Sequence, residues 1–324
     1  MQTPEFWSGR DRSARLACTL LAPIGLFYGA TIAWKRDHAQ AWRARAKVVC
    51  IGNLTVGGTG KTPIAIAIGK MLLERGLKTV FLSRGYGGKE HGPVRVSRER
   101  DSAAQVGDEP LLLAGAAPTI VSRDRRAGAE LADAAQADVI VMDDGHQNFA
   151  LAKDLSLVVV DAQSGFGNGH VLPAGPLRES AKQGLARADA VILGGDGNPD
   201  LGNFQGAVLR VHLKPLADRA LLAKPVVAFA GTGRPDKFFA TLAALGAQIV
   251  DAIPFPDHHE YAASELARLK AKAKGNGAQL ITTEKDYVRL SPADREAIAM
   301  LPVAAQFDDD AALNALLDRL TAPR

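Results

Sequence analysis

From Lys47 onward, short apolar runs alternate with longer amphipathic stretches, a pattern typical of α/β proteins. The run at residues 48–51 predicts a buried strand, and Ile64, Ile68 and Leu72 recur on one face of the helix that should follow it. Further apolar runs predict strands at 79–83, 119–122, 139–142, 157–160 and 190–193. Because these runs are apolar throughout, we expect a mostly parallel sheet flanked by helices on both faces.

The pattern changes near residues 196–206, where Gly, Asn, Asp and Pro follow one another without periodicity. A second α/β series opens at Lys224, with strands expected at 226–230, 248–253 and 279–282 and helices at 237–245 and 264–274. We therefore expect a main core at 47–205, an extended linker at 206–223, and a smaller C-terminal α/β domain at 224–324 that closes a cleft.

Residues 1–46 form a separate segment, in which positions 16–34 carry no charged side chain. Arg15 precedes this run and Lys35 follows it, and Trp7 and Trp34 lie near its ends. The length is borderline for a membrane span. Three interpretations are open: a marginal span, an interfacial helix, or a buried helix of the main core. The basic and aromatic flanks favour a helix in contact with anionic lipid headgroups.

Composition excludes several classes of protein. The 324 residues are 47% hydrophobic and 23% charged, as in ordinary globular proteins rather than disordered or polytopic membrane proteins. Cys18 and Cys50 cannot form a disulfide framework, and no metal-type spacing links them to a histidine. The net charge of +4 is too small to indicate nucleic acid, and residues 1–50 hold eight Lys/Arg against three Asp/Glu. We expect no nucleic-acid partner.

The sharpest chemical signal is a glycine-rich loop between the first predicted strand and helix, which resembles a P-loop. Its backbone N–H groups would converge on phosphate, Lys61 would reach the β/γ-phosphates, and the Thr62 hydroxyl would bind Mg²⁺. The usual pattern has Gly where this chain has Thr55, so a turn that binds nothing is the alternative. The predicted nucleotide-binding residues are Thr55, Val56, Gly57, Gly58, Thr59, Gly60, Lys61 and Thr62.

A second element of the nucleotide site follows the strand at 139–142, where Asp143 and Asp144 come next. Carboxylates at this end of a buried strand would lie beside the P-loop and hold Mg²⁺, although Asp-Asp-Gly is also a common turn sequence. GTPases, partition ATPases and small-molecule kinases share such a site. A guanine-specificity segment is not matched, because Lys285 is followed directly by Asp286.

Five further motifs have no place in a generic P-loop protein. They are Ser-Arg-Gly-Tyr-Gly-Gly at 83–88, Val-Gly-Asp-Glu-Pro at 106–110, Pro-Ala-Gly-Pro-Leu-Arg-Glu at 173–179, Phe-Pro-Asp-His-His at 255–259 and Thr-Thr-Glu-Lys-Asp at 282–286. With the P-loop and Asp-Asp-Gly-His-Gln at 143–147, they make the chain resemble the tetraacyldisaccharide 4′-kinase (lipid A 4′-kinase) family. The resemblance covers nearly the whole chain in the family's order, and Thr55 is the family's own form.

The resemblance implies ATP- and Mg²⁺-dependent phosphorylation of the 4′-hydroxyl of a lipid A disaccharide 1-phosphate, at the cytoplasmic face of the bacterial inner membrane. Asp108 matches the aspartate taken as general base, and His258 the histidine paired with it from the second domain. Arg178 matches a basic residue at the phosphates, alongside Lys61 as a catalytic residue. The acidic positions near Mg²⁺ are Asp143, Asp144 and Glu179.

These roles agree with the chemistry, and several alternatives stay open. An aspartate with a pKa of ~3.9 is a weak base for an alcohol, and an adjacent histidine can orient it and share the proton. Asp108 could instead cap a helix with Pro110 in its first turn. His258 and His259 could exchange roles. Arg84 and Tyr86 either contact the substrate headgroup or form a structural turn, and the roles of His146 and Gln147 are not assigned.

We therefore expect a monomeric, membrane-associated lipid kinase that uses ATP and Mg²⁺, converts the disaccharide 1-phosphate to the 1,4′-bisphosphate, and releases ADP. A second hypothesis is a partition-type switch ATPase that uses hydrolysis to control dimerisation at a membrane. Under that hypothesis Asp108, His258, Arg178 and Glu179 would have no chemical purpose.

Overall fold

The computed structural model describes residues 4–7, 11–217, 221 and 223–321. Its main sheet has nine strands in the order β13-β8-β7-β6-β1-β5-β2-β4-β3. All neighbours pair in parallel except β13 with β8 and β3 with β4, which are antiparallel. In chain order the strands are β1 (Lys47–Gly52), β2 (Thr79–Ser83), β3 (Val94–Arg95), β4 (Thr119–Val121), β5 (Val139–Asp143), β6 (Leu155–Asp161), β7 (Ala190–Gly194), β8 (Ala207–Pro215) and β13 (Val303–Phe307).

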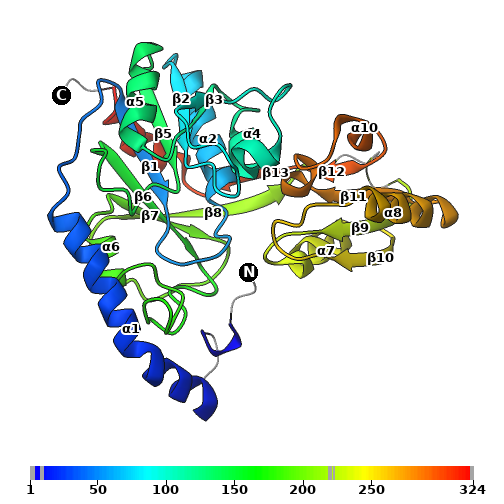
Figure 1. The fold of residues 1–324 in the computed structure, drawn as a ribbon, viewed down its shortest axis with the longest axis horizontal. Helices are drawn as coiled ribbons and strands as arrows, with labels where there is room; N and C mark the ends of the chain where they lie inside the picture. Colours follow the sequence, from blue (N-terminus) through cyan, green and yellow to red (C-terminus); the bar gives the residue numbers. More distant parts are fainter. Residues whose placement is uncertain (1–3, 8–10, 218–220, 222, 322–324) are drawn as a thin grey trace.

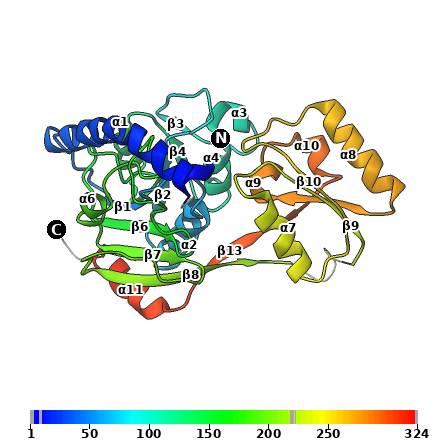
Figure 2. The same ribbon diagram turned by 90° about the horizontal axis from the view of Figure 1, so that it is seen from below.

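Helices cover both faces of this sheet (Figures 1 and 2). On one face, Ile64, Ile68 and Leu72 of α2 pack with leucines of α11 against β1, β5 and β6. On the other face, alanines of α5 pack against Val48, Cys50 and neighbouring strands. The helices of this part are α2 (Lys61–Glu74), α3 (Ala103–Val106), α4 (Asp108–Leu113), α5 (Arg125–Ala134), α6 (Ala181–Leu185) and α11 (Asp310–Asp318). The predicted fold class, a P-loop-type parallel sheet with flanking helices, is confirmed.

A second, smaller sheet of four parallel strands has the order β10-β9-β11-β12. Helix α7 packs on one face of it through Phe238 and Leu242, and α8 packs on the other through Leu266 and Leu269. The elements are β9 (Val226–Ala230), α7 (Pro235–Ala244), β10 (Ile249–Pro254), α8 (Ala263–Gly275), β11 (Gln279–Thr283), α9 (Glu284–Tyr287), α10 (Pro292–Arg295) and β12 (Ala299–Leu301). Figure 1 shows this small domain to the right of the large one.

The predicted domain boundaries need two corrections. The region expected as an extended linker contains β8, which pairs in parallel with β7 and belongs to the large sheet. The C-terminal region expected in the small domain returns to the large sheet, where β13 pairs with β8 and α11 joins the large core. The sequence signal of β8 is weak because the strand is buried on only part of its length, with Leu209 and Val211 as its buried residues.

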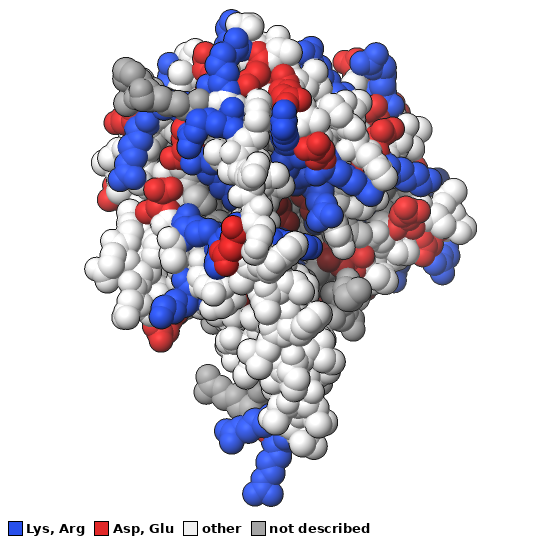
Figure 3. Space-filling model, turned by 60° about the vertical axis from the view of Figure 1, so that its left-hand side comes forward, with Lys and Arg blue, Asp and Glu red and all other residues white. Residues whose placement is uncertain are grey.

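The N-terminal segment begins with the 3₁₀ helix η1 (Glu5–Trp7) and continues as the 26-residue helix α1 (Arg12–Asp37). Leu26 is 76% exposed and Phe27 is 73% exposed, and the only buried residues of α1 are Ala14, Cys18 and Gly25. This exposure rules out the interpretation of a buried core helix. By length and composition alone, α1 could cross a membrane. Figure 3 shows the lower part of the molecule, where α1 lies, as a projection with mainly uncharged side chains.

The N-terminal segment, η1 together with α1, packs against the loop between β6 and α6. The indole N–H of Trp7 donates to the carbonyl of Pro173 (3.1 Å), and the amide of Asn168 contacts the sulfur of Cys18 (3.2 Å). Gly25 lies so close to the backbone of Val171 that an added Cβ would meet its carbonyl oxygen at 2.8 Å. The same loop continues into residues 176–178, which bond to the glycine-rich loop after β1.

Candidate active site

The glycine-rich loop lies where β1 ends at Gly52 and α2 begins at Lys61. Gly60 is the N-cap of α2, with a left-handed φ of 79°, and no side chain caps this end of the helix. A glycine suits that backbone conformation because it has no Cβ. The N–H groups at the start of α2 are therefore left for an anion, which the positive end of the helix dipole also favours.

The loop is braced from the side by residues 176–178. The N–H of Val56 donates to the carbonyl of Pro176 (2.8 Å), and the N–H of Arg178 donates to the carbonyl of Leu54 (2.7 Å). The amide of Asn53 donates to the carbonyl of Thr55 (2.7 Å). These bonds fix the backbone of the loop and do not use the N–H groups at residues 58–62, which the sequence predicts as phosphate donors.

The ammonium of Lys61 faces Asp144 rather than solvent. The Nζ atom of Lys61 lies 3.5 Å from Oδ1 of Asp144, and Nη1 of Arg178 donates to both oxygens of Asp144 at 2.9 and 3.0 Å. Burial lowers the pKa of Lys61, and Asp144 opposes that effect. Burial would raise the pKa of Asp144, but Lys61 and Arg178 outweigh it and lower the pKa. Three predicted site residues thus form one cluster of charges beside the loop.

Asp143 and Thr62 form the part of the site that suits a magnesium ion. The Thr62 hydroxyl donates to Oδ2 of Asp143 (3.2 Å), and Oδ1 of Asp143 is buried without a hydrogen-bond partner among the described residues. Burial raises the pKa of Asp143 to about 7, with Asp144 and Glu109 adding to the rise and Lys61 opposing it. A buried carboxylate oxygen lacking a partner, beside a hydroxyl, matches the hard oxygen ligands that Mg²⁺ prefers. The residues present therefore fit the ion.

In the described part of the chain, no group of three His, Cys, Asp or Glu side chains could hold a metal by itself.

Glu179 was predicted near the metal, but it lies in a different set of contacts. Its side chain is 2% exposed, and both its oxygens accept from Nη2 of Arg187 at 2.7 and 2.8 Å. Oε1 also accepts from Gln147 (2.9 Å), and Gln147 in turn donates to the carbonyl of Asn53 (3.0 Å). Glu179 is therefore connected to the start of the glycine-rich loop through Gln147, which bonds to Asn53.

His146 is a buried structural residue. Nε2 contacts the carbonyl of Gly184 (2.9 Å), Nδ1 contacts the hydroxyl of Ser156 (3.2 Å), and an added Cβ at Gly52 would meet the Cβ of His146 at 2.5 Å. Burial lowers the pKa of His146 to about 3, with Lys153 adding to the effect, so its ring is neutral. The close packing of His146 against Gly52 explains why the strand before the loop ends in glycine.

A second part of the candidate site is formed by Asp108 and His258, which come from different domains. Nδ1 of His258 lies 2.9 Å from Oδ2 of Asp108. The N-cap of α4 is Gly107, not Asp108, and no side chain caps that helix, so the alternative role of Asp108 as a cap is wrong. His259 points elsewhere, to Glu265 at 2.9 Å, which settles which histidine meets Asp108.

Tyr86 and Arg84 lie on the loop after β2, and both side chains are exposed. The ring of Tyr86 is 68% exposed and meets the ring of His258 edge-on, with centroids 5.7 Å apart. Tyr86 therefore borders the Asp108–His258 pair on a side that solvent reaches.

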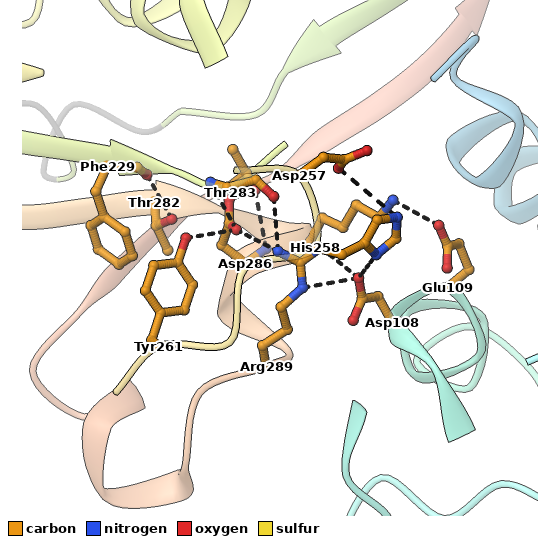
Figure 4. Close-up of polar contacts among 12 residues, drawn as sticks. Asp108, Glu109, Phe229, Asp257, His258, Tyr261, Thr282, Thr283, Asp286 and Arg289 are labelled. Atoms are coloured by element: carbon orange, nitrogen blue, oxygen red, sulfur yellow. Dashed lines mark hydrogen bonds and ion pairs between the residues drawn. The ribbon is translucent and has the colours of Figure 1, made fainter. Parts of the chain in front are cut away.

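Arg289 is the residue at this site that the sequence did not reveal. Its Nε and Nη2 atoms donate to Oδ2 of Asp108 at 2.9 and 2.5 Å, and its Nη1 donates to Asp286 (2.8 Å) (Figure 4). Next to it, Nζ of Lys285 lies 2.7 Å from Glu109. The motif at 282–286 was the one available signal, because Lys285 and Asp286 are two of its members.

Burial would raise the pKa of Asp108, but hydrogen bonds from His258 and Arg289 outweigh it and lower the pKa to about 2. Asp108 is therefore ionised at neutral pH and acts only as a hydrogen-bond acceptor. It follows that Nδ1 of His258 carries the proton of their hydrogen bond.

The chain matches known proteins over nearly its full length. The family model for tetraacyldisaccharide-1-P 4′-kinase matches residues 17–322. A tetraacyldisaccharide 4′-kinase of Rhodospirillum rubrum is 49% identical over 332 residues, covering 100% of this chain and 99% of the relative. One of a Methylobacterium species is 51% identical, with coverages of 97% and 96%.

Among solved structures, the "apo" form of LpxK from Aquifex aeolicus in complex with ATP is similar with a TM-score of 0.78 and 25% identity. The match covers 94% of this chain and 99% of that one. Together with the family match, this shows that the chain belongs to the tetraacyldisaccharide-1-phosphate 4′-kinase family.

Proposed function

We propose that this protein transfers the γ-phosphoryl group of ATP to the 4′-hydroxyl of a tetraacyldisaccharide 1-phosphate, giving the 1,4′-bisphosphate and ADP in lipid A biosynthesis. The observation that carries the proposal is the contact between Asp108 and His258, at 2.9 Å. Such a pair can take the proton of an acceptor hydroxyl during phosphoryl transfer. The alternative, a switch ATPase that activates only water and dimerises, has no use for a base shared between two domains.

The donor side would act mainly through position and charge, as phosphoryl transfer requires. The N–H groups before and at the start of α2 would bind the phosphates. The ammonium of Lys61, which now contacts Asp144, would contact the phosphate oxygens instead. Arg178 donates to the carboxylate of Asp144, so it would add a second positive charge beside the phosphates. Thr62 and Asp143 would hold Mg²⁺, which neutralises charge on the phosphates when bound.

On the acceptor side, Asp108 would accept the proton of the 4′-hydroxyl as the new O–P bond forms. Its Oδ2 is already occupied by His258 and Arg289, so Oδ1 is the oxygen left for the substrate. His258 would hold the carboxylate in place through its Nδ1–H and spread the charge. Tyr86, exposed beside His258, is positioned to contact the sugar.

We further propose that α1 lies on the cytoplasmic leaflet of the inner membrane and that the protein works there as a monomer. The exposed apolar side chains of α1 and the basic Lys35 and Arg36 in its last turn support an interfacial position. Because α1 packs on the loop that also contacts the glycine-rich loop, a lipid acceptor held at the membrane would be presented to an adjacent site.

The test is a transfer assay with γ-³²P-ATP, Mg²⁺ and the disaccharide 1-phosphate in mixed detergent micelles. We expect a labelled bisphosphate from the wild-type protein and a loss of it in Lys61→Ala. ATP hydrolysis that is independent of the lipid, together with ATP-dependent dimers, would instead favour the switch. A deletion of residues 1–36 that stays folded but no longer binds vesicles would locate the membrane contact.

A further inference from the structure

Arg289 is a buried arginine of the small domain whose guanidinium contacts the proposed base in the large domain. Its side chain is 5% exposed. Nε and Nη2 both donate to Oδ2 of Asp108, the oxygen that also accepts from His258. In the part of the chain that the structure describes, Oδ1 of Asp108 accepts no hydrogen bond. All donors therefore converge on one oxygen of the carboxylate and leave the other for a substrate.

The Nη1 atom of the guanidinium, which does not contact Asp108, is also held by hydrogen bonds. Nη1 of Arg289 donates to the carbonyl of Gly231 (2.9 Å) and to Oδ1 of Asp286 (2.8 Å). Asp286 is fully buried, and it accepts from the N–H of Gly231 (3.0 Å), the hydroxyl of Tyr261 (2.8 Å) and the hydroxyl of Thr283 (2.6 Å). These contacts leave the guanidinium no other arrangement, so its position is set by the small domain.

We infer that Arg289 is a positioning residue for phosphoryl transfer: it holds Oδ2 of Asp108 so that Oδ1 is the oxygen presented to the acceptor hydroxyl. The inference rests on the proposed function and deepens it. In phosphoryl transfer, catalysis depends mainly on positioning and on electrostatic stabilisation, so the geometry of the group that accepts the proton matters alongside its basicity. A carboxylate clamped through one oxygen meets that need even though its pKa is low.

The charges around Asp108 support this role. Burial alone would raise its pKa, while His258, Arg289 and Lys285 together lower it to about 2. Lys285 is paired with Glu109 at 2.7 Å. Without Arg289, only His258 and Lys285 would oppose the effect of burial on Asp108, so the pKa of Asp108 would rise.

Two further groups face His258, one from the residue before it and one from the loop after β2. Oδ1 of Asp257 lies 3.9 Å from Nε2 of His258, and the ring of Tyr86 meets it edge-on. Asp286 and Tyr261 lie on the far side of Arg289 and reach Asp108 only through it. Arg289 is therefore the group whose removal changes both the orientation and the charge environment of Asp108.

The experiment compares Arg289→Gln and Arg289→Lys with Arg268→Gln, an exposed arginine on α8 of the same domain. We measure kcat, the KM values for ATP and lipid, and the pH profile of kcat/KM. In Arg289→Gln we expect kcat to fall about 10²-fold, the scale of a misplaced reacting group, with the KM for ATP within a few-fold of wild type. The acid limb of the profile should move to higher pH. Arg289→Lys keeps the positive charge but loses the two parallel donors of the guanidinium, so its kcat should lie between those of wild type and Arg289→Gln. Arg268→Gln should match wild type.

A more conservative variant covers the case in which Arg289→Gln fails to fold. Tyr261→Phe removes one of the three groups of the small domain that donate to Asp286 and leaves those of Gly231 and Thr283, so we expect a fall in kcat of a few-fold with only a small drop in melting temperature. A wild-type kcat and pH profile in Arg289→Gln, or in Tyr261→Phe where the former is unfolded, overturns the inference. Such a result differs from failure of the proposed function, in which the wild-type protein itself makes no labelled lipid.

Discussion

The two sides of the site reach their geometry in different ways. On the donor side, the glycine-rich loop is a continuous piece of chain between β1 and α2, held by backbone hydrogen bonds to residues 176–178 of the same domain. On the acceptor side, Asp108 meets His258 and Arg289, which lie 150 and 181 positions away in the sequence, and every bond is made by side chains. The donor side can therefore be complete in the large domain alone, whereas the acceptor side exists only when the small domain is in place.

The largest effect that separates the two sides is expected from Asp108→Asn. This change keeps the shape of the side chain but removes the charge, so kcat should fall by about 10²–10⁴, the range for loss of a general base. Binding of ATP should be nearly unchanged, because the donor side does not use Asp108. Equilibrium binding of a fluorescent ATP analogue, measured beside the transfer assay, checks both parts. An unchanged kcat would remove Asp108 from the mechanism.

The free energy of unfolding should depend on pH through His146, which packs beside the glycine-rich loop. Its pKa is about 3 in the folded protein, below its ordinary value of 6.5, so between these values the unfolded chain binds a proton that the folded protein does not. The free energy of unfolding should therefore decrease as the pH falls below 6.5, by up to ~1.4 kcal/mol per pH unit from this group.

Urea unfolding at pH 7.5, 6.5 and 5.5 measures that slope. His146→Asn should be less stable at every pH but show a shallower slope, while His170→Asn, at an exposed position, should keep the slope of the wild type. Equal slopes in all three proteins would contradict the assignment.

Asp108 gives a separate contribution to the pH dependence of stability, with its pKa of about 2: its stabilisation is present above about pH 4 and is lost as the pH falls toward 2.

A smaller effect is expected from Gly60→Ala. Gly60 has a φ of 79°, and an added Cβ would lie 3.1 Å from Cδ1 of Leu213. A left-handed alanine costs roughly 1–2 kcal/mol, so unfolding should become easier by about that amount. Gly58→Ala is the matched control for stability, since its Cβ would meet nothing within 4 Å. Equal denaturation midpoints for the two variants would show that the backbone of the loop is not held as described.

How much of this arrangement could be predicted from the sequence follows from the same contrast. The glycine-rich loop and Asp143 depend on local patterns, a strand followed by a loop and a helix, and these can be read from neighbouring residues. Asp108 and His258 look like turn residues in isolation, and only the resemblance to a family singled them out. For Arg289 the neighbouring motif at 282–286 was the one available signal, because its partner Asp108 is 181 positions away and nothing local marks an arginine as buried.

The misplaced boundaries have a similar cause. Strand β8 is half-exposed near the edge of the large sheet, and β13 reaches it from the end of the chain after the small domain is complete. Sequence pattern gives the elements but not the return of the chain to an earlier sheet. The place of Glu179 beside the metal stays a prediction, and its contacts with Arg187 and Gln147 depend on side-chain packing that no motif encodes.

The smallest expected effect concerns the packing of α1 on the donor side. An alanine normally stabilises a helix relative to glycine by ~1 kcal/mol. Gly29→Ala should show this gain, since its Cβ would lie 4.0 Å from the nearest atom, a side-chain carbon of Val171. Gly25→Ala should lose it, because its Cβ would meet the carbonyl oxygen of Val171 at 2.8 Å. Melting temperatures of both variants test the contact, and equal gains would show that α1 is not seated on this loop.

The central claim is that a phosphoryl group held at Lys61 passes directly to a lipid hydroxyl beside Asp108. A single turnover tests it most directly: the protein is loaded with γ-³²P-ATP and Mg²⁺, mixed with excess disaccharide 1-phosphate in micelles, and quenched at successive times. We expect the label to appear in the 4′-phosphate of the lipid at the rate at which ATP disappears. Label recovered as inorganic phosphate, with the lipid unmodified, would contradict the account.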